Sequence, residues 1–320
     1  MHTWGRVRGV NLGGLLDSRE GVEPGWQLRP EHLDAIATAG FDCVRLPVRW
    51  WGTSAGALDE LVGAVVEQAL QRDLAVVLSM HHADGLMTGE PEAAEKLTEL
   101  WTGLARRFAG VKDPRLAFDL LNEPRDAITP AVWNALLPTV LAAVRAEDAS
   151  RAVIVGGARM STLAGLLELE PPADQNLAVT LHYYEPFAFT HQGAHWEEGA
   201  DAWTGTRWLG GESNARGNGW PGGPHWADAE RDRRTVTTDL SRAAAWAQER
   251  GLQLLVGEFG AYEKAPWADR VAWTGWVRAE CERLGLGWAH WDFATDFGVY
   301  DPATQAWRPD LLHALTGAQP

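Results

Sequence analysis

Two glutamates stand at positions that packing explains poorly. Glu123 follows the apolar run 116–121, and Glu258 follows the apolar run 252–256, each beside a helix-breaking Pro or Gly. Strands carry their polar residues on a solvated face, and paired acids at two strand ends do not belong to that pattern. If the fold brings the two carboxylates together, they can perform acid–base or nucleophilic chemistry on one substrate.

The elements around these acids alternate regularly. Eight short apolar runs are each followed by a segment of helical periodicity, of which 58–70 is an example. Near-continuous apolar strands separated by helices are typical of a parallel sheet covered on its outside. Eight such units predict a single-domain α/β protein with a (β/α)8 TIM barrel rather than an open sheet. The runs are 7–12, 43–47, 74–80, 116–121, 152–156, 177–181, 252–256 and 286–291.

Polar residues gather at the predicted C-terminal ends of these strands, where barrels of this kind place their chemistry. His182 and Tyr184 lie two residues apart, so both point to the same side of their strand while Tyr183 points away. Arg45 interrupts an apolar strand, and a buried guanidinium requires a carboxylate partner, either Glu258 or another acid. The gathered residues are Asn11, Arg45, His81, His82, Asn122, Glu123, His182, Tyr184, Glu258, Trp291 and Asp292.

The 320 residues show no internal repeat beyond the strand–helix unit and no linker, which predicts one catalytic domain over 1–320. Two connections are too long to be simple turns: about 185–233 after the sixth strand, and 293–309 after the eighth. Long loops on a catalytic face form lids or cleft walls, and we expect this of 185–233. That insertion holds five tryptophans: Trp196, Trp203, Trp208, Trp220 and Trp226.

Composition excludes several classes of function. A net charge of −15 without clustered Lys or Arg argues against nucleic acid, and no apolar run reaches the ~18 residues of a membrane span. Only Cys43 and Cys281 are present, which excludes a disulfide framework or a Cys-based zinc site and leaves one disulfide as the alternative to the two reduced, buried thiols that we expect. The start of the chain has no signal segment, so we expect a cytoplasmic protein if Met1 is native and a secreted one if a leader was removed.

Aromatic usage points to sugars. The chain has 18 Trp against 12 Phe and Tyr together, an inversion of the ordinary preference. A sugar ring offers a face of C–H groups and a rim of hydroxyls, so its binding needs flat aromatic platforms and hydrogen-bonding partners. Most of these tryptophans belong to the core or to loop packing. Trp291 follows its strand to the mouth of the barrel, and we expect it to be a sugar platform.

Seven strings, in matching order between about residues 7 and 292, resemble glycoside hydrolase family 5, whose members are retaining β-glycanases of the cellulase type. The segment 186–196 is also similar to the lid insertion of some bacterial endoglucanases. The seven strings are Gly9-Val10-Asn11-Leu12-Gly13-Gly14, Val44-Arg45-Leu46-Pro47, Met80-His81-His82, Asn122-Glu123-Pro124, Leu181-His182-Tyr183-Tyr184, Gly257-Glu258-Phe259-Gly260 and Trp291.

The resemblance implies a role for each residue. Glu123 would be the general acid and then the base, with a pKa raised above that of a free Glu by burial and by the neighbouring carboxylate. Glu258 would be the ionised nucleophile, held by Arg45 and the Tyr184 hydroxyl. Asn122 would bond the sugar 2-hydroxyl. Of the remaining residues, His81 would order the site, while His82, His182, Tyr184 and Trp291 would bind substrate.

The implied activity is that of a retaining, endo-acting β-glycoside hydrolase, an endo-β-1,4-glucanase (cellulase) using double displacement. Its partner would be a β-linked glucan or gluco-oligosaccharide, no cofactor or metal is expected, and we expect a monomer. A β-mannanase, a β-1,3-glucanase and an oligosaccharide-acting β-glucosidase remain alternatives within the family. Asp292 stands where many cellulase-type members carry a neutral or small residue, and Asp296 lies nearby. Extra acid there would change which sugar hydroxyls are bound.

Other classes remain as alternatives. A non-catalytic sugar-binding barrel would be suggested by the loss of either glutamate, and both are present. A metal-dependent barrel hydrolase needs ligands that share one side of a strand, whereas the adjacent His81 and His82 are expected to face oppositely. The string 52–56 formally matches the serine-hydrolase elbow, but Pro47 ends the preceding strand too early for that sharp turn.

Overall fold

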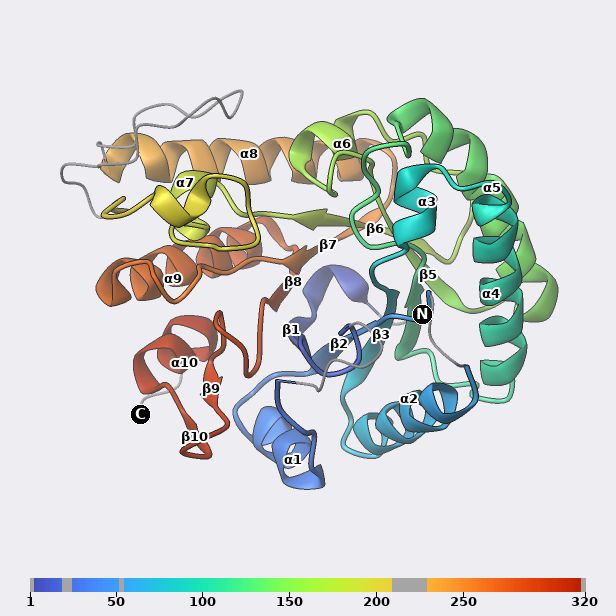
Figure 1. Cartoon of the computed structure of the whole chain (residues 1–320), viewed down its shortest axis with the longest axis horizontal. Helices are drawn as coiled ribbons and strands as arrows, with labels where there is room; N and C mark the ends of the chain where they lie inside the picture. Colours follow the sequence, from blue (N-terminus) through green and yellow to red (C-terminus); the bar gives the residue numbers. More distant parts are fainter. Residues whose placement is uncertain (1–2, 19–24, 52–54, 209–228, 318–320) are drawn as a thin grey trace.

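A closed barrel of eight parallel strands forms the centre of the molecule (Figure 1). The computed structural model describes residues 3–18, 25–51, 55–208 and 229–317. Each strand pairs with the next in sequence, and β8 closes the barrel by pairing with β1. The predicted fold class is therefore confirmed. The strands are β1 (Arg8–Asn11), β2 (Cys43–Val48), β3 (Ala75–Met80), β4 (Leu116–Asp119), β5 (Ala152–Gly156), β6 (Leu177–His182), β7 (Gln253–Glu258) and β8 (Gly287–His290).

Helices surround the barrel as an outer ring (Figure 1). The longer ones are α1 (Pro30–Thr38), α2 (Ala55–Leu70), α4 (Ala93–Phe108), α5 (Pro130–Glu147), α8 (Ala229–Glu249) and α9 (Trp267–Leu284). The remaining short elements are η1 (Trp4–Arg6), α3 (Asp84–Thr88), α6 (Leu163–Leu167), α7 (Phe187–Thr190), η2 (Ala200–Ala202), the β9–β10 hairpin (Tyr300–Asp301 and Ala306–Trp307) and α10 (Pro309–Thr316).

Local sequence sets the helix ends. The hydroxyl of Thr129 accepts a hydrogen bond from the Val132 amide, and Pro130 occupies the first turn of α5, where a missing N–H costs nothing. At the C-terminal end of α9, the helix stops at Gly285, which adopts a left-handed conformation with φ of 70°. Within the described residues, no helix combines the length and the apolar character that crossing a membrane would need.

Successive side chains along each strand point alternately outward to the helices and inward to the barrel, so the core has two parts. One set of buried residues packs between the strands and the helices, and it includes Val44, Val76 and Phe118. The other set fills the bottom of the barrel interior and includes Val77 and Ala117, with Trp4 beneath it. The buried Cys43 belongs to this inner set, and both it and the buried Cys281 are free thiols, as predicted.

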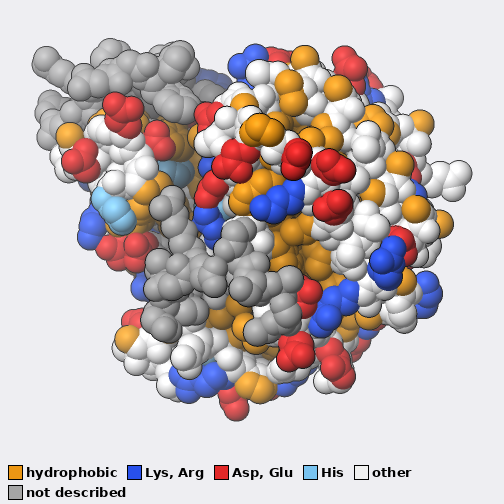
Figure 2. Space-filling model, turned by 45° about the vertical axis from the view of Figure 1, so that its right-hand side comes forward, with side chains coloured by type: hydrophobic (Ala, Val, Ile, Leu, Met, Phe, Trp, Pro, Cys, Tyr) orange, Lys and Arg blue, Asp and Glu red, His pale blue; other side chains and the backbone are white. Residues whose placement is uncertain are grey.

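Farther along the strands, the inward positions change from apolar to polar. Arg45 follows Cys43 on the inner face of β2, Ser79 follows Val77 on β3, and Asp119 follows Ala117 on β4. A polar layer therefore lies directly above the apolar bottom of the barrel, at the C-terminal ends of the strands. On the molecular face in Figure 2, acidic and basic side chains are mixed over the described surface.

Two buried tryptophans tie outer helices to the ends of strands. The indole N–H of Trp101 on α4 donates to the Leu120 carbonyl at 2.8 Å, and that of Trp133 on α5 donates to the Gly156 carbonyl at 2.8 Å. Both indoles are fully buried, so no water can replace either bond. Since Leu120 lies just before Asn122 and Glu123, the Trp101 bond also helps to fix the loop that carries them.

Trp101→Phe tests this connection. The substitution keeps most of the packing but leaves a buried carbonyl without a donor, which we expect to lower the free energy of unfolding by about 1–3 kcal/mol. Trp267→Phe is the matched control, because its indole N–H donates to Asp310 at 3.1 Å in an exposed position. The control should lose less than about 1 kcal/mol in urea unfolding. Equal losses in the two variants would contradict the role given to the Trp101 bond.

Candidate active site

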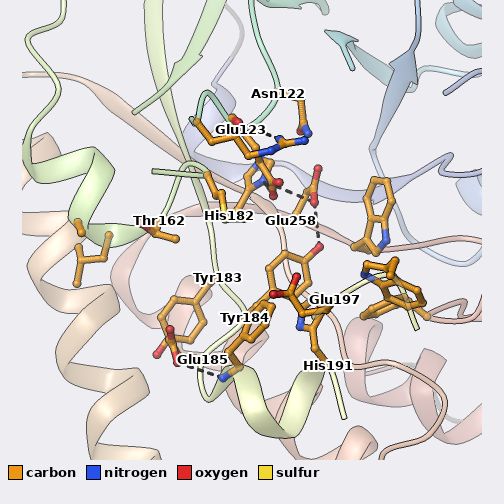
Figure 3. A pocket seen from close by; sticks show the side chains of 18 of the residues that line it. Asn122, Glu123, Thr162, His182, Tyr183, Tyr184, Glu185, His191, Glu197 and Glu258 are labelled. Carbon is orange, nitrogen blue, oxygen red and sulfur yellow. Dashed lines mark hydrogen bonds and ion pairs between the residues drawn. The ribbon is translucent and has the colours of Figure 1, made fainter. Parts of the chain in front are cut away.

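A cavity of about 890 Å³ opens at the C-terminal end of the barrel (Figure 3). Its walls combine acids, histidines and aromatic rings from the strand ends with residues of the segment after β6. Of the residues predicted from sequence, it is lined by His81, His82, Asn122, Glu123, His182, Tyr184, Glu258 and Trp291. Arg45 and Asn11 lie beneath, in the polar layer of the barrel.

Arg45 is the centre of the hydrogen-bond network below the cavity. Its Nη1 donates to Glu258 Oε1 at 2.6 Å and to Asn11 Oδ1 at 2.9 Å. Its Nη2 donates to Asn122 Oδ1 at 2.7 Å, and both Nη2 and Nε donate to Asp119 at 3.0–3.1 Å. The guanidinium is 1% exposed, so two carboxylates balance its charge away from water. The sequence offered Glu258 or another acid as the partner of Arg45. The structure shows both, because Arg45 pairs with Glu258 and with Asp119.

Glu258 ends β7 and faces the cavity because of an irregularity in the sheet. Leu181 pairs with Val256, whereas His182 pairs with Glu258, so Gly257 is an extra residue on β7. Strict alternation would turn Glu258 outward toward the helices. A Cβ on Gly257 would lie 2.4 Å from the Thr180 hydroxyl oxygen, which explains why glycine occupies this position.

The two glutamates approach each other across the cavity (Figure 3). Glu258 Oε2 accepts a hydrogen bond from the Tyr184 hydroxyl at 2.9 Å. Glu123, just beyond β4, has a φ of 46° and contacts His182 Nδ1 through Oε1 at 2.8 Å. The same nitrogen lies 3.5 Å from Glu258 Oε2. One oxygen of each carboxylate and one nitrogen of His182 all lie within 4.8 Å of one another.

The acidities of the pair differ from the sequence-based expectation. Burial acts to raise the pKa of Glu123, but the hydrogen bond with His182 and the charges of His182, Arg125 and Arg45 outweigh it, so this pKa lies below its ordinary value. Burial raises the pKa of Glu258, although His182 and Arg45 oppose the shift. The expected rise for Glu123 was wrong because it counted burial and the second carboxylate without the contact from His182.

The other predicted residues take distinct places. Tyr183 turns from the two glutamates, and its hydroxyl donates to Asp239 of α8 at 3.2 Å. Asn11 donates to the Gly257 carbonyl at 2.9 Å, which holds the irregular turn of β7. Trp291 lies parallel to the His81 ring, with centroids 5.7 Å apart and planes inclined by 6°. Trp291 also lines the cavity.

Asp292 does not take the place that the sequence suggested for it. It is fully buried outside the cavity lining, and its Oδ1 accepts a hydrogen bond from the Thr295 amide at 3.1 Å. Because it cannot reach a sugar, the expectation that it alters hydroxyl recognition was wrong. The neighbouring Asp296 does line the cavity.

Of the tryptophans in the insertion after β6 (185–233) that the structure describes, only one lines the cavity. Trp196 lines the cavity and is 49% exposed, whereas Trp208 is fully buried against Phe189. Trp203 is also buried. Trp220 and Trp226 lie outside the described residues. So do residues 52–54 of the string that formally matched the serine-hydrolase elbow.

Several lining residues escaped the sequence analysis. Asp17 follows the glycines after β1, and burial raises its pKa from 3.8 to about 6. Asp17 could have been found from the sequence, because it is an acidic residue shortly after the C-terminal end of the first strand, and the other site residues were chosen for that position. His191 and Glu197 come from the insertion, where no strand end marks a position.

Comparison with known proteins agrees with this architecture. The family model described as Cellulase (glycosyl hydrolase family 5) matches residues 21–296. Endoglucanase C of Acetivibrio thermocellus is 26% identical over 339 residues, which cover 96% of this chain and 97% of that protein. Endoglucanase H of the same organism is also 26% identical, but this chain spans only 32% of its length.

Solved structures give the same result. Cel5A of Thermotoga maritima, in a structure described as a complex with cellobiose, has a TM-score of 0.86 and 34% identity, covering 98% of this chain and 97% of that one. A second structure of Cel5A, described as a complex with mannotriose, has a TM-score of 0.87. The barrel and its site thus define a glycoside hydrolase. Since the family model spans most of its length, the chain belongs to the cellulase family, glycosyl hydrolase family 5.

Asp292 generates a prediction about pH and stability. Burial raises its pKa from 3.8 to about 8, so the folded protein holds this proton more tightly than the unfolded chain does. The contribution to stability is therefore complete below about pH 4 and is lost as the pH rises toward 8. Asp292→Asn removes this titrating group. The difference in Tm, variant minus wild type, should therefore increase as the pH is raised from about 4 to about 8, as measured by scanning calorimetry.

Asp296→Asn is the matched control, since this nearby carboxylate is exposed. Its Tm should follow that of the wild type across the same pH series. Parallel curves for Asp292→Asn and wild type would show that Asp292 does not exchange its proton in this range.

Proposed function

We propose that this protein is a retaining, endo-acting β-1,4-glucanase that uses a double-displacement mechanism. The observation that carries the proposal is the separation of the two carboxylates, whose nearest ligand oxygens lie within 4.8 Å. Retaining enzymes hold their carboxyl groups about 5–5.5 Å apart, whereas inverting enzymes need about 6.5–9.5 Å to admit a water molecule between them. The short separation favours direct attack by a carboxylate.

Glu258 is the proposed nucleophile. Arg45 at 2.6 Å and the Tyr184 hydroxyl at 2.9 Å stabilise its ionised form and fix the direction of its oxygens. Attack on the anomeric carbon forms a glycosyl ester at Glu258 as the bond to the leaving oxygen breaks. Its own hydrogen-bond partners thus prepare this carboxylate for the reaction, because they hold it rigidly in the base of the cavity.

Glu123 is the proposed acid and base. It protonates the departing oxygen in the first step and removes a proton from water in the second. His182 Nδ1 lies 2.8 Å from Glu123 and 3.5 Å from Glu258, so we propose that it passes the proton of the pair from Glu258 to Glu123. In this transfer Nδ1–H gives its proton to Glu123 and Nδ1 then takes up the proton of Glu258, against the acidities given above, which leaves Glu258 ionised and Glu123 protonated as the first step requires.

The substrate proposal is supported by the relatives. Those compared above are named endoglucanases, and Cel5A is described with cellobiose. Because Cel5A is also described in complex with mannotriose, a β-mannan is the second candidate. Trp291, Asn122 and His82 would bind the sugar ring and its hydroxyls in either case. We also propose that the whole barrel acts as one catalytic domain, and rates on soluble β-glucans and mannans would rank the two substrates.

The stereochemistry of hydrolysis tests the mechanism. NMR of the first-formed product should show the β-anomer, and early α-anomer would exclude Glu258 as the nucleophile. Glu258→Ala should abolish turnover while the protein remains folded. Glu123→Ala should spare the first step on substrates with activated leaving groups and slow poor leaving groups by ~10²–10⁴-fold.

Glu197→Gln is the matched control, because this carboxylate lines the same cavity outside the reacting pair. Any effect of this variant should be equal for activated and poor leaving groups. A leaving-group dependence at Glu197 rather than at Glu123 would reassign the acid.

The insertion gives a separate prediction on chain length. Trp196 is half-exposed on the cavity wall, so Trp196→Ala should reduce kcat/KM for a long glucan more than for a short aryl glycoside. Trp208→Ala is the comparison, since its fully buried ring should affect thermal stability and both substrates alike. If Trp196→Ala also lowered both rates equally, the insertion would not contact the longer substrate.

A further inference from the structure

A second group of potential ligands borders the cavity, separate from the two glutamates. Asp17, His81 and His82 each offer one ligand atom, and these three atoms lie within 4.8 Å of one another. All three residues line the cavity, so a dissolved ion can reach them. Asp17 belongs to the loop after β1 and the histidines follow β3, which means that the barrel brings two distant segments together here.

Two atoms of this group lack hydrogen-bond partners. Within the part of the chain that the structure describes, Asp17 Oδ1 and His81 Nδ1 contact no donor or acceptor, although the two side chains are only 8% and 4% exposed. A buried polar atom without a hydrogen-bond partner destabilises the folded protein. Two such atoms, on residues that both line the cavity and place ligand atoms within 4.8 Å of one another, indicate a ligand that interacts with both residues.

Backbone geometry removes the objection that adjacent histidines must face opposite sides. His82 has a φ of 58°, so the alternation of β3 is broken directly after His81. The two rings meet edge to face, with centroids 4.3 Å apart and planes at 88°. Both imidazoles are therefore presented to the cavity, and the sequence-based argument against a shared ligand set was wrong.

Neighbouring positive charge is already compensated. Three arginines act electrostatically on the histidines, and each has a carboxylate partner. Arg45 pairs with Asp119 and Glu258, Arg49 with Asp84, and Arg125 with Asp126. Asp17 is not among these partners, so its charge can be used for a cation.

We propose that Asp17, His81 and His82 form a binding site for a divalent transition-metal ion of the zinc type, and that the bound ion inhibits hydrolysis. Two imidazoles and one carboxylate suit Zn²⁺ or Cu²⁺, whereas Mg²⁺ and Ca²⁺ prefer oxygen ligands alone. Ligands on tetrahedral Zn²⁺ are about 3.4 Å apart, so the donors must approach by no more than about 1.4 Å. Rotation of the half-buried His82 ring can supply much of this approach.

Inhibition follows from the location. His82 and Trp291 are proposed above to bind a substrate sugar, and His81 stacks on Trp291, so an ion on these histidines occupies part of the same space. Inhibition rests on the proposed function, but metal binding itself does not. The two parts can therefore fail separately in an experiment.

Calorimetric titration of the full chain with Zn²⁺ tests the site. Asp17→Asn and His81→Asn should each weaken binding at least about tenfold relative to wild type. His195→Asn is the matched control, because this histidine is exposed and lies outside the group. Two ligand variants are used so that misfolding of one, detected by circular dichroism, leaves the other informative. Unchanged affinity in a folded ligand variant would overturn the site.

A further variant separates this site from the catalytic acids. Glu123, His182 and Glu258 also place ligand atoms within 4.8 Å of one another, so Glu123→Gln should leave Zn²⁺ affinity unchanged if the ion binds at Asp17. Loss of binding in Glu123→Gln would move the ion to the carboxylate pair and overturn the proposal.

The inhibitory part is tested by kinetics on a soluble glucan. Zn²⁺ should raise the apparent KM with little change in kcat, and EDTA should reverse the effect. Binding at the site with unchanged hydrolysis would refute the inhibition alone. If no glycan were hydrolysed at all, the proposed function would fail while the calorimetric result still decided the metal site.

Discussion

A guanidinium enclosed by a barrel needs its charge balanced, and this requirement organises the polar layer. Arg45 forms bonds to Glu258, Asp119, Asn11 and Asn122, which come from β1, β4, β7 and the loop after β4. A charge pair out of water contributes little net stability, but removing one partner leaves a costly unpaired charge. The network therefore makes the relative positions of these segments interdependent, and Glu258, the proposed nucleophile, belongs to it.

The fold could be predicted from sequence because its signals are repeated. Eight apolar runs separated by helical periodicity leave few architectures, and the closed parallel barrel follows from them. Glu123, Arg45 and Glu258 could be identified because charged residues are unusual in or beside apolar strands. Their convergence at one cavity required only that the C-terminal ends of parallel strands meet at one end of a barrel.

Details that depend on broken alternation could not be predicted in this way. The extra residue at Gly257 turns Glu258 inward, and the positive φ of His82 directs its ring beside that of His81. Both effects come from single residues whose conformation depends on tertiary contacts. The lower pKa of Glu123 is similar, since it depends on a 2.8 Å contact with His182 on another strand. Residue type cannot reveal such distances.

The left-handed backbone at Glu123 and His82 has a consequence for evolution and engineering. With φ of 46° and 58°, both residues adopt a conformation that disfavours a side chain by roughly 1–2 kcal/mol relative to glycine. Selection for thermal stability alone would favour glycine or asparagine at these positions and would remove groups that face the cavity. A relative that gained stability through glycine at position 123 would lack the carboxylate that we propose as acid and base, and glycine at position 82 would remove a proposed sugar contact.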